Sequence, residues 1–84
     1  MSALQLPPVR AAYFLGIGGI GMSALARHAL ALGWEVGGYD KTPTPLTDAL
    51  VAEGVWFTTD DSVESLPAAF NTPGEVLVVW TPAI

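Results

Sequence analysis

Apolar residues along this chain gather in short runs that alternate with stretches of helical spacing. Residues 11–15, Ala-Ala-Tyr-Phe-Leu, form one run that ends at Gly16, and residues 75–80, Glu-Val-Leu-Val-Val-Trp, form another that is rich in β-branched side chains. Continuous apolar runs of this length are typical of strands that are buried in a parallel sheet. Residues 35–39 and 55–58 predict two further strands, although the first of these contains two glycines.

Helical patterns fill the first interval between these strands. Good helix formers dominate from Ile20 to Leu32, and Leu25, Ala29 and Leu32 recur at helical spacing. Gly33 follows at the position where a glycine commonly ends a helix. We therefore expect a helix over residues 20–32.

A second helix is expected between the second and third strands. Thr44 fits its N-cap, Pro45 its first helical position and Asp48 the positive end of its dipole, and Gly54 closes it. After the third strand, residues 62–70 suggest a short helix that a proline interrupts, and a turn over residues 71–74 leads into the last strand.

The predicted order is strand, helix, strand, helix, strand, a short helix, and strand. With right-handed crossovers this order gives an α/β fold, a Rossmann-like, doubly wound parallel sheet in three layers. The 84 residues, of which 51% are hydrophobic, are enough for one domain. Because Rossmann-like sheets usually continue beyond four strands, we expect the fold to be truncated after the fourth.

Composition excludes several classes of function. Three basic against eight acidic residues give a net charge of −5, which argues against a nucleic-acid partner. There is no cysteine, and His28 is the only histidine, so a thiolate or multi-histidine metal site is not expected. No apolar stretch reaches the roughly 20 residues of a membrane span, and the opening residues lack signal-peptide features, so we expect a cytoplasmic location.

A glycine-rich loop follows the first predicted strand and opens the first predicted helix. Residues 16–21, Gly-Ile-Gly-Gly-Ile-Gly, satisfy G-x-G-x-x-G in the context that this motif requires. Gly16 would permit the tight turn, Gly18 the approach of backbone to a diphosphate, and Gly21 close packing of helix against strand. Free N–H groups and the helix dipole then hold the anion without basic side chains.

Asp40 provides a second signal for nucleotide binding. It follows the loop by about 20 residues, at the end of the second predicted strand, where an acid commonly accepts hydrogen bonds from ribose. A structural interpretation, in which the glycines only shape a turn and Asp40 only begins a loop, stays open. Ser23 fits a phosphate contact and a bond to the helix backbone equally well, and Lys41 fits a solvated loop position better than a phosphate contact. The motif does not choose among NAD, FAD and a UDP-sugar.

Two segments of the sequence resemble the Mur ligase family, and within it the ligases that act on UDP-N-acetylmuramate and L-alanine. Residues 13–26, Tyr-Phe-Leu-Gly-Ile-Gly-Gly-Ile-Gly-Met-Ser-Ala-Leu-Ala, are similar to the family's opening segment, and the continuation Met22-Ser23 narrows the resemblance. Residues 78–84, Val-Val-Trp-Thr-Pro-Ala-Ile, resemble a later segment in which two serines often replace Thr81-Pro82. Many members also have serine where this chain has Tyr39.

The resemblance implies that residues 1–84 are the N-terminal UDP-binding domain of a three-domain ligase, with the central ATPase and C-terminal domains absent from this chain. It implies UDP-N-acetylmuramate as the small-molecule partner, the remaining domains of the same polypeptide as further partners, and a role in peptidoglycan synthesis. ATP and Mg²⁺ are expected for the full-length enzyme, and no cofactor for this fragment, which has no P-loop sequence and is expected to be inactive alone. The expected site for UDP and its diphosphate, with no catalytic residue or metal ligand, is Gly16, Gly18, Gly19, Ile20, Gly21, Met22, Ser23, Asp40 and Thr81.

Two other interpretations compete with this one. A related ligase, such as the one that recycles murein tripeptide, shares the fold but usually differs at the glycine loop. An NAD(P)-binding oxidoreductase or regulatory domain explains the glycines and Asp40 but gives no reason for the segment Thr-Pro-Ala-Ile at residues 81–84. The nucleotide that binds would separate these classes.

Overall fold

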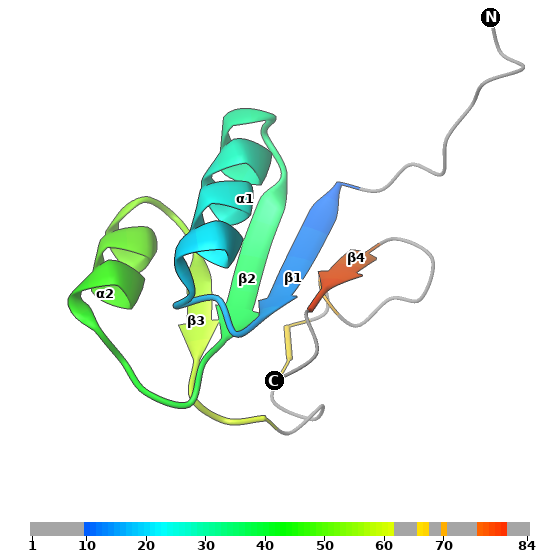
Figure 1. Ribbon diagram of the computed structural model, residues 1–84. Helices are drawn as coiled ribbons and strands as arrows, with labels where there is room; N and C mark the ends of the chain where they lie inside the picture. The colour runs from blue at the N-terminus through cyan, green and yellow to red at the C-terminus, as the bar shows by residue number, and fades with distance from the viewer. Residues whose placement is uncertain (1–9, 62–65, 68–69, 71–75, 81–84) are drawn as a thin grey trace, which may run out of the picture.

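The structure, a computed structural model, describes residues 10–61, 66–67, 70 and 76–80. A single four-stranded sheet forms its centre, and both helices pack on it (Figure 1). The elements follow in the order β1 (Ala11–Leu15), α1 (Ile20–Ala31), β2 (Glu35–Tyr39), α2 (Pro45–Ala52), β3 (Trp56–Thr58) and β4 (Val76–Val79).

All strand pairs in the sheet are parallel, and their spatial order is β3-β2-β1-β4. The chain therefore moves outward from β1 through β2 to β3 and then returns to the other side of β1. This reversal is the topological switch of a doubly wound sheet, and ligands of such sheets bind outside the carboxyl ends of the strands at that point. The predicted α/β, Rossmann-like parallel fold is confirmed.

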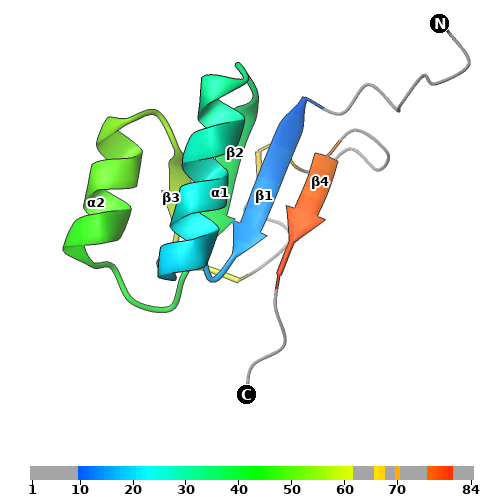
Figure 2. The same cartoon turned by 45° about the horizontal axis from the view of Figure 1, so that its top comes forward.

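One face of the sheet is covered by α1 and α2, as both views show (Figures 1 and 2). The core on this face includes Phe14 and Val36 from the sheet, Ala26 from α1 and Leu50 from α2, all at most 3% exposed. The opposite face carries a cluster of aromatic rings. There Tyr13 lies 5.5 Å from Phe70 and 6.3 Å from Trp56 between ring centroids, at separations that favour tilted aromatic pairs.

The predicted element bounds agree closely with those of the structure. β1 and β2 match, and α1 ends one residue before the predicted Leu32. β3 begins at Trp56 because the N–H of Val55 donates to the Leu50 carbonyl at 3.0 Å, in the turn that closes α2. The predicted short helix over 62–70 and the turn over 71–74 lie largely outside the described residues.

The two glycines of β2 have specific steric roles. A Cβ on Gly38 would lie 2.5 Å from Ile17 Cδ1, and one on Gly37 would lie 2.8 Å from the Phe70 ring. Both distances are below van der Waals contact, so a side chain at either position would force a neighbour to move. The neighbours that require these glycines are Ile17 of the glycine loop and Phe70.

Within the described part of the chain, no helix is long and apolar enough to cross a membrane.

Candidate nucleotide site

The glycine loop lies at the carboxyl ends of β1 and β2, next to the topological switch. Gly16 has a φ of +86°, a left-handed conformation that supports its predicted role in a tight turn. The N–H groups of Gly16 and Ile17 both donate to the Tyr39 carbonyl, at 2.7 and 3.0 Å. Ile17 itself is fully buried against Gly38. The end of β2 therefore holds the start of the loop in place.

The first turn of α1 presents three free backbone donors. The Gly19 N–H donates to the Gly16 carbonyl at 3.0 Å, and the Ser23 N–H donates to the Gly19 carbonyl at 2.8 Å. Between them, the N–H groups of Ile20, Gly21 and Met22 have no acceptor among the residues that the structure describes. A helix N-terminus with free N–H groups and a positive dipole end is suited to an anion such as a diphosphate.

Asp40 is fixed against this loop. Its Oδ2 accepts the Gly18 N–H at 2.8 Å, and its Oδ1 lies 3.4 Å from the Thr42 N–H. A Cβ on Gly18 would come within 2.7 Å of Asp40 Oδ2, so glycine is required for this contact. The carboxylate holds the loop with one oxygen and keeps acceptor capacity on the other, as a group that binds a hydroxyl or N–H of a ligand must.

Two of the expected diphosphate donors are already engaged inside the protein. The Gly18 N–H is bound to Asp40 and the Gly19 N–H to Gly16, so the free donors are those of Ile20, Gly21 and Met22. The expectation that Gly21 allows close packing of helix against strand is wrong, because a Cβ there would meet nothing within 4 Å. Its position instead leaves the helix N-terminus open to solvent.

Ser23 uses its hydroxyl within the helix. The side chain is 3% exposed and its Oγ donates to the Ile20 carbonyl at 2.9 Å. Of the two roles considered for Ser23, the structure therefore shows the hydrogen bond to the helix backbone. Met22, 8% exposed, contributes its side chain to the core, and only its N–H faces the candidate site.

The start of α2 forms the outer wall of the site. Thr44 and Thr47 make a reciprocal capping box, in which the Thr44 N–H donates to Thr47 Oγ1 at 2.8 Å and the Thr47 N–H to Thr44 Oγ1 at 3.2 Å. Thr47 is fully buried, and its Cγ2 lies 3.4 Å from a Cβ placed on Gly18. Sequence reasoning identified Thr44 as the cap but missed Thr47, although the T-x-x-T spacing signals it.

The other candidates contribute less to the site. Thr81 lies outside the described residues, and Lys41 and Trp80, the residue just after β4, are both exposed. His28 is exposed on α1, away from the loop, and the described residues contain no group of three potential metal ligands. The hydrogen bonds from Gly16 and Ile17 to the Tyr39 carbonyl could not be predicted from the sequence, because every residue has a backbone carbonyl.

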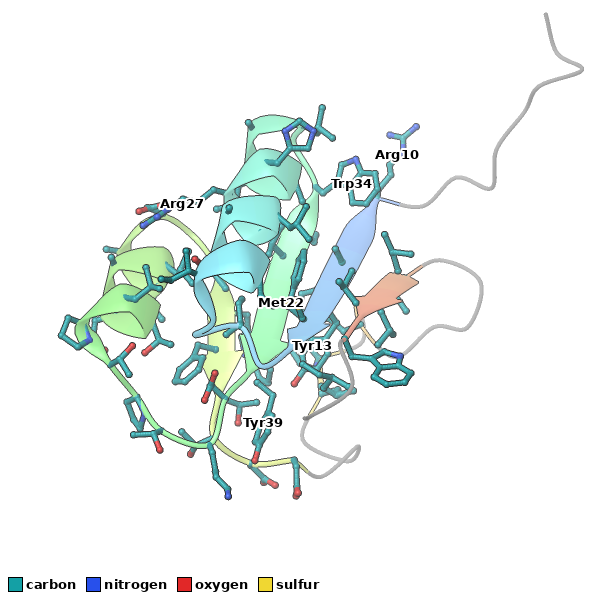
Figure 3. The ribbon with its side chains drawn as sticks, viewed as in Figure 1. Arg10, Tyr13, Met22, Arg27, Trp34 and Tyr39 are labelled. Carbon is teal, nitrogen blue, oxygen red and sulfur yellow. The ribbon has the colours of Figure 1, made fainter. Side chains whose placement is uncertain are left out.

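Tyr39 and Tyr13, both labelled in Figure 3, line a largely apolar cavity of about 270 Å³. Burial, together with the nearby Asp60 carboxylate and Tyr39, raises the pKa of the Tyr13 phenol above its ordinary value. Tyr13 is therefore neutral at physiological pH and serves as a packing residue of the aromatic cluster.

Comparison with known proteins identifies the family. The family described as "Mur ligase family, catalytic domain" matches residues 11–83. A UDP-N-acetylmuramate–L-alanine ligase of Parabacteroides distasonis is 51% identical over 81 residues, which cover 96% of this chain and 18% of that relative. One from Porphyromonas gingivalis is 51% identical over 72 residues, covering 86% of this chain and 16% of the relative.

A ligase of the same name from Flavobacterium johnsoniae is 42% identical over 81 residues, again 96% of this chain and 18% of the relative. The chain thus spans less than a fifth of the length of these relatives. Because the family match covers the whole described sheet, both helices and the glycine loop, this chain belongs to the Mur ligase family.

Proposed function

We propose that this chain is the N-terminal substrate-binding part of a ligase that adds L-alanine to UDP-N-acetylmuramate in an ATP-dependent step of peptidoglycan synthesis. In this role it holds the UDP moiety. The observation that carries the proposal is the set of three free N–H groups at the start of α1, beside Asp40 and at the switch point of the sheet. The names of the matching relatives support the choice of substrate.

The diphosphate belongs closest to Ile20, Gly21 and Met22, whose N–H groups are free to donate. Asp40 carries negative charge, so its carboxylate favours a neutral donor of the uridine part over a phosphate oxygen. These two preferences orient the nucleotide, with its diphosphate on the helix N-terminus and its uridine toward the end of β2. The chain's own contribution is binding and orientation.

ATP and Mg²⁺ are part of the proposed full-length activity, and we assign neither of them to this segment. The sequence contains no G-x-x-x-x-G-K-[ST] loop, and the described residues offer no cluster of three acidic or histidine side chains. We therefore assign no catalytic step to this chain, and we expect it alone to lack ligase activity. Alanine- and UDP-N-acetylmuramate-dependent ATP hydrolysis by the purified 84-residue chain would overturn that expectation.

A cytoplasmic location belongs to the same proposal.

Calorimetric titrations with UDP-N-acetylmuramate, UDP, NAD and ATP test the proposed ligand. We expect heat from the two uridine ligands and none from NAD. Asp40→Asn keeps an oxygen that accepts the Gly18 N–H but loses the charge, so it should weaken uridine-ligand binding roughly tenfold. Asp48→Asn, an exposed acid in the first turn of α2, is the matched control and should leave affinity unchanged.

The same titrations separate the competing classes. Selective binding of NAD would support the NAD(P)-binding oxidoreductase or regulatory domain, which shares the glycine loop and Asp40. Equal binding of the uridine ligands to the wild-type and Asp40→Asn chains would remove Asp40 from the site while leaving the ligand assignment intact.

A further inference from the structure

An apolar groove runs between α1 and β4, on the face of the sheet that the helices cover. It has a volume of about 240 Å³, and nine side chains of the described residues line it. Phe14 and Trp34 form part of its floor, whereas Leu25, Leu32 and Leu77 are 52%, 58% and 48% exposed. Large apolar side chains that gather on one surface usually mark a site where another element packs.

The topology explains why α1 and α2 leave β4 uncovered on this face of the sheet. α1 and α2 cover the face while the chain moves from β1 to β3, and β4 stands beyond α1 without a covering helix in the described part of the chain (Figure 2). The connection that returns to β4 brings Leu66 and Phe70 to the opposite face. A right-handed crossover to any strand beyond β4 would place its helix on that opposite face too.

The size of the groove indicates which kind of occupant fits. A stable interface between separate proteins involves about 20–30 residues on each side, whereas nine of the residues that the structure describes line this groove. A tethered segment does not need so large an interface, because its effective concentration reaches roughly the millimolar range. The relatives supply such a tether, since the matched segment is 18% of their length or less.

We propose that an amphipathic helix from the part of the ligase polypeptide outside this segment packs into the groove, alongside α1. Among the described residues that line the groove, His28 is the only one with an ionisable side chain, so the occupant presents an uncharged apolar stripe. Residues at i, i+3 or i+4, and i+7 of that helix contact Leu25, Leu32 and Leu77. This inference rests on family membership and on topology, and it is independent of nucleotide binding.

The test compares one substitution in two contexts. In the first, the 84-residue chain is studied alone; in the second, it replaces the matched 81 residues of the Parabacteroides distasonis ligase. Leu25→Gln and Leu77→Gln should change little in the isolated chain, where both side chains are half-exposed. In the chimera each should speed amide hydrogen exchange in α1 roughly tenfold, because it removes a buried contact.

Val51→Gln is the matched control. Val51 is 49% exposed on α2 and does not line the groove, so its substitution should act equally in both contexts. If the groove substitutions also act equally in both contexts, no helix of the ligase occupies the groove and the proposal is wrong.

Sedimentation of the isolated chain provides a second test that does not depend on the chimera. We expect a monomer at micromolar concentration. A dimer that Leu25→Gln dissociates would assign the groove to a second copy of this chain and overturn the proposal.

Discussion

Replacement of Gly38 by alanine should strongly destabilise the domain without touching the proposed ligand. The added methyl group would lie 2.5 Å from Ile17 Cδ1, 2.7 Å from Ile17 Cβ and 2.9 Å from the Phe14 carbonyl oxygen. The last two atoms belong to a fully buried branched side chain and to the backbone of β1, so neither can move without shifting the sheet or the glycine loop.

Overpacking of this kind costs about 1–3 kcal/mol, and the rigid neighbours place Gly38→Ala near the upper end. In a domain of this size each kcal/mol lowers the melting temperature by roughly 4–8 °C, so we expect a fall of about 10 °C or more. Thermal unfolding followed by circular dichroism measures it.

Gly21→Ala is the matched control, because a Cβ at Gly21 meets nothing within 4 Å. Alanine in a helix is favoured over glycine, so this variant should be neutral or more stable by up to about 1 kcal/mol. Equal melting temperatures for Gly38→Ala and wild type would refute the packing of Ile17 over β2, and with it the way the loop is held.

Three further predictions concern the wall of the site, a surface ion pair and the aromatic cluster. Thr47→Val should cost about 1–3 kcal/mol in urea unfolding, because it leaves the Thr44 N–H without its acceptor, whereas a loss near zero would contradict the capping box. The Arg27 hydrogen bond, and secondarily its charge, holds the pKa of Glu53 below the ordinary value. Arg27→Gln should therefore raise the Glu53 pKa, which carbon NMR measures. The depressed pKa stabilises the fold above the unfolded-state pKa, and this stabilisation is lost as pH falls through the folded-state pKa. High salt should weaken the interaction of this exposed pair. A Glu53 pKa that is unchanged in Arg27→Gln would contradict the predicted rise. Since the pKa of Tyr13 is raised, mainly by burial, the stability of the fold should decline as pH rises through alkaline values. Tyr13→Phe should remove this part of the decline in unfolding followed by ultraviolet absorbance. An identical alkaline decline in both chains would contradict the prediction.

Much of the fold follows from local sequence patterns. β1 reads as an uninterrupted apolar run, and α2 carries a threonine cap with proline behind it, so both begin where the pattern predicts. These features are local, and neighbouring residues are enough to define them. The parallel order of the sheet follows in turn from the alternation of strands and helices.

The details of the site depended on contacts between distant residues and could not be predicted in the same way. The motif assigned Gly18 to a diphosphate contact and Gly21 to packing of helix against strand, yet in the structure Gly18 closes on Asp40 and Gly21 faces open space. Which N–H groups remain free depends on acceptors supplied by Asp40 and by the Gly16 carbonyl. A spacing pattern identifies the loop but not this division of its donors.

The most direct test of the central claim is to follow the backbone amides of Ile20, Gly21 and Met22 by nitrogen-15 NMR while UDP-N-acetylmuramate is added. We predict that these three signals move most and in step, because their N–H groups become donors to the diphosphate, and that the Gly19 signal, whose N–H is already bound to Gly16, moves less. Saturable binding with shifts confined to other parts of the chain, and none at these three amides, would contradict the account.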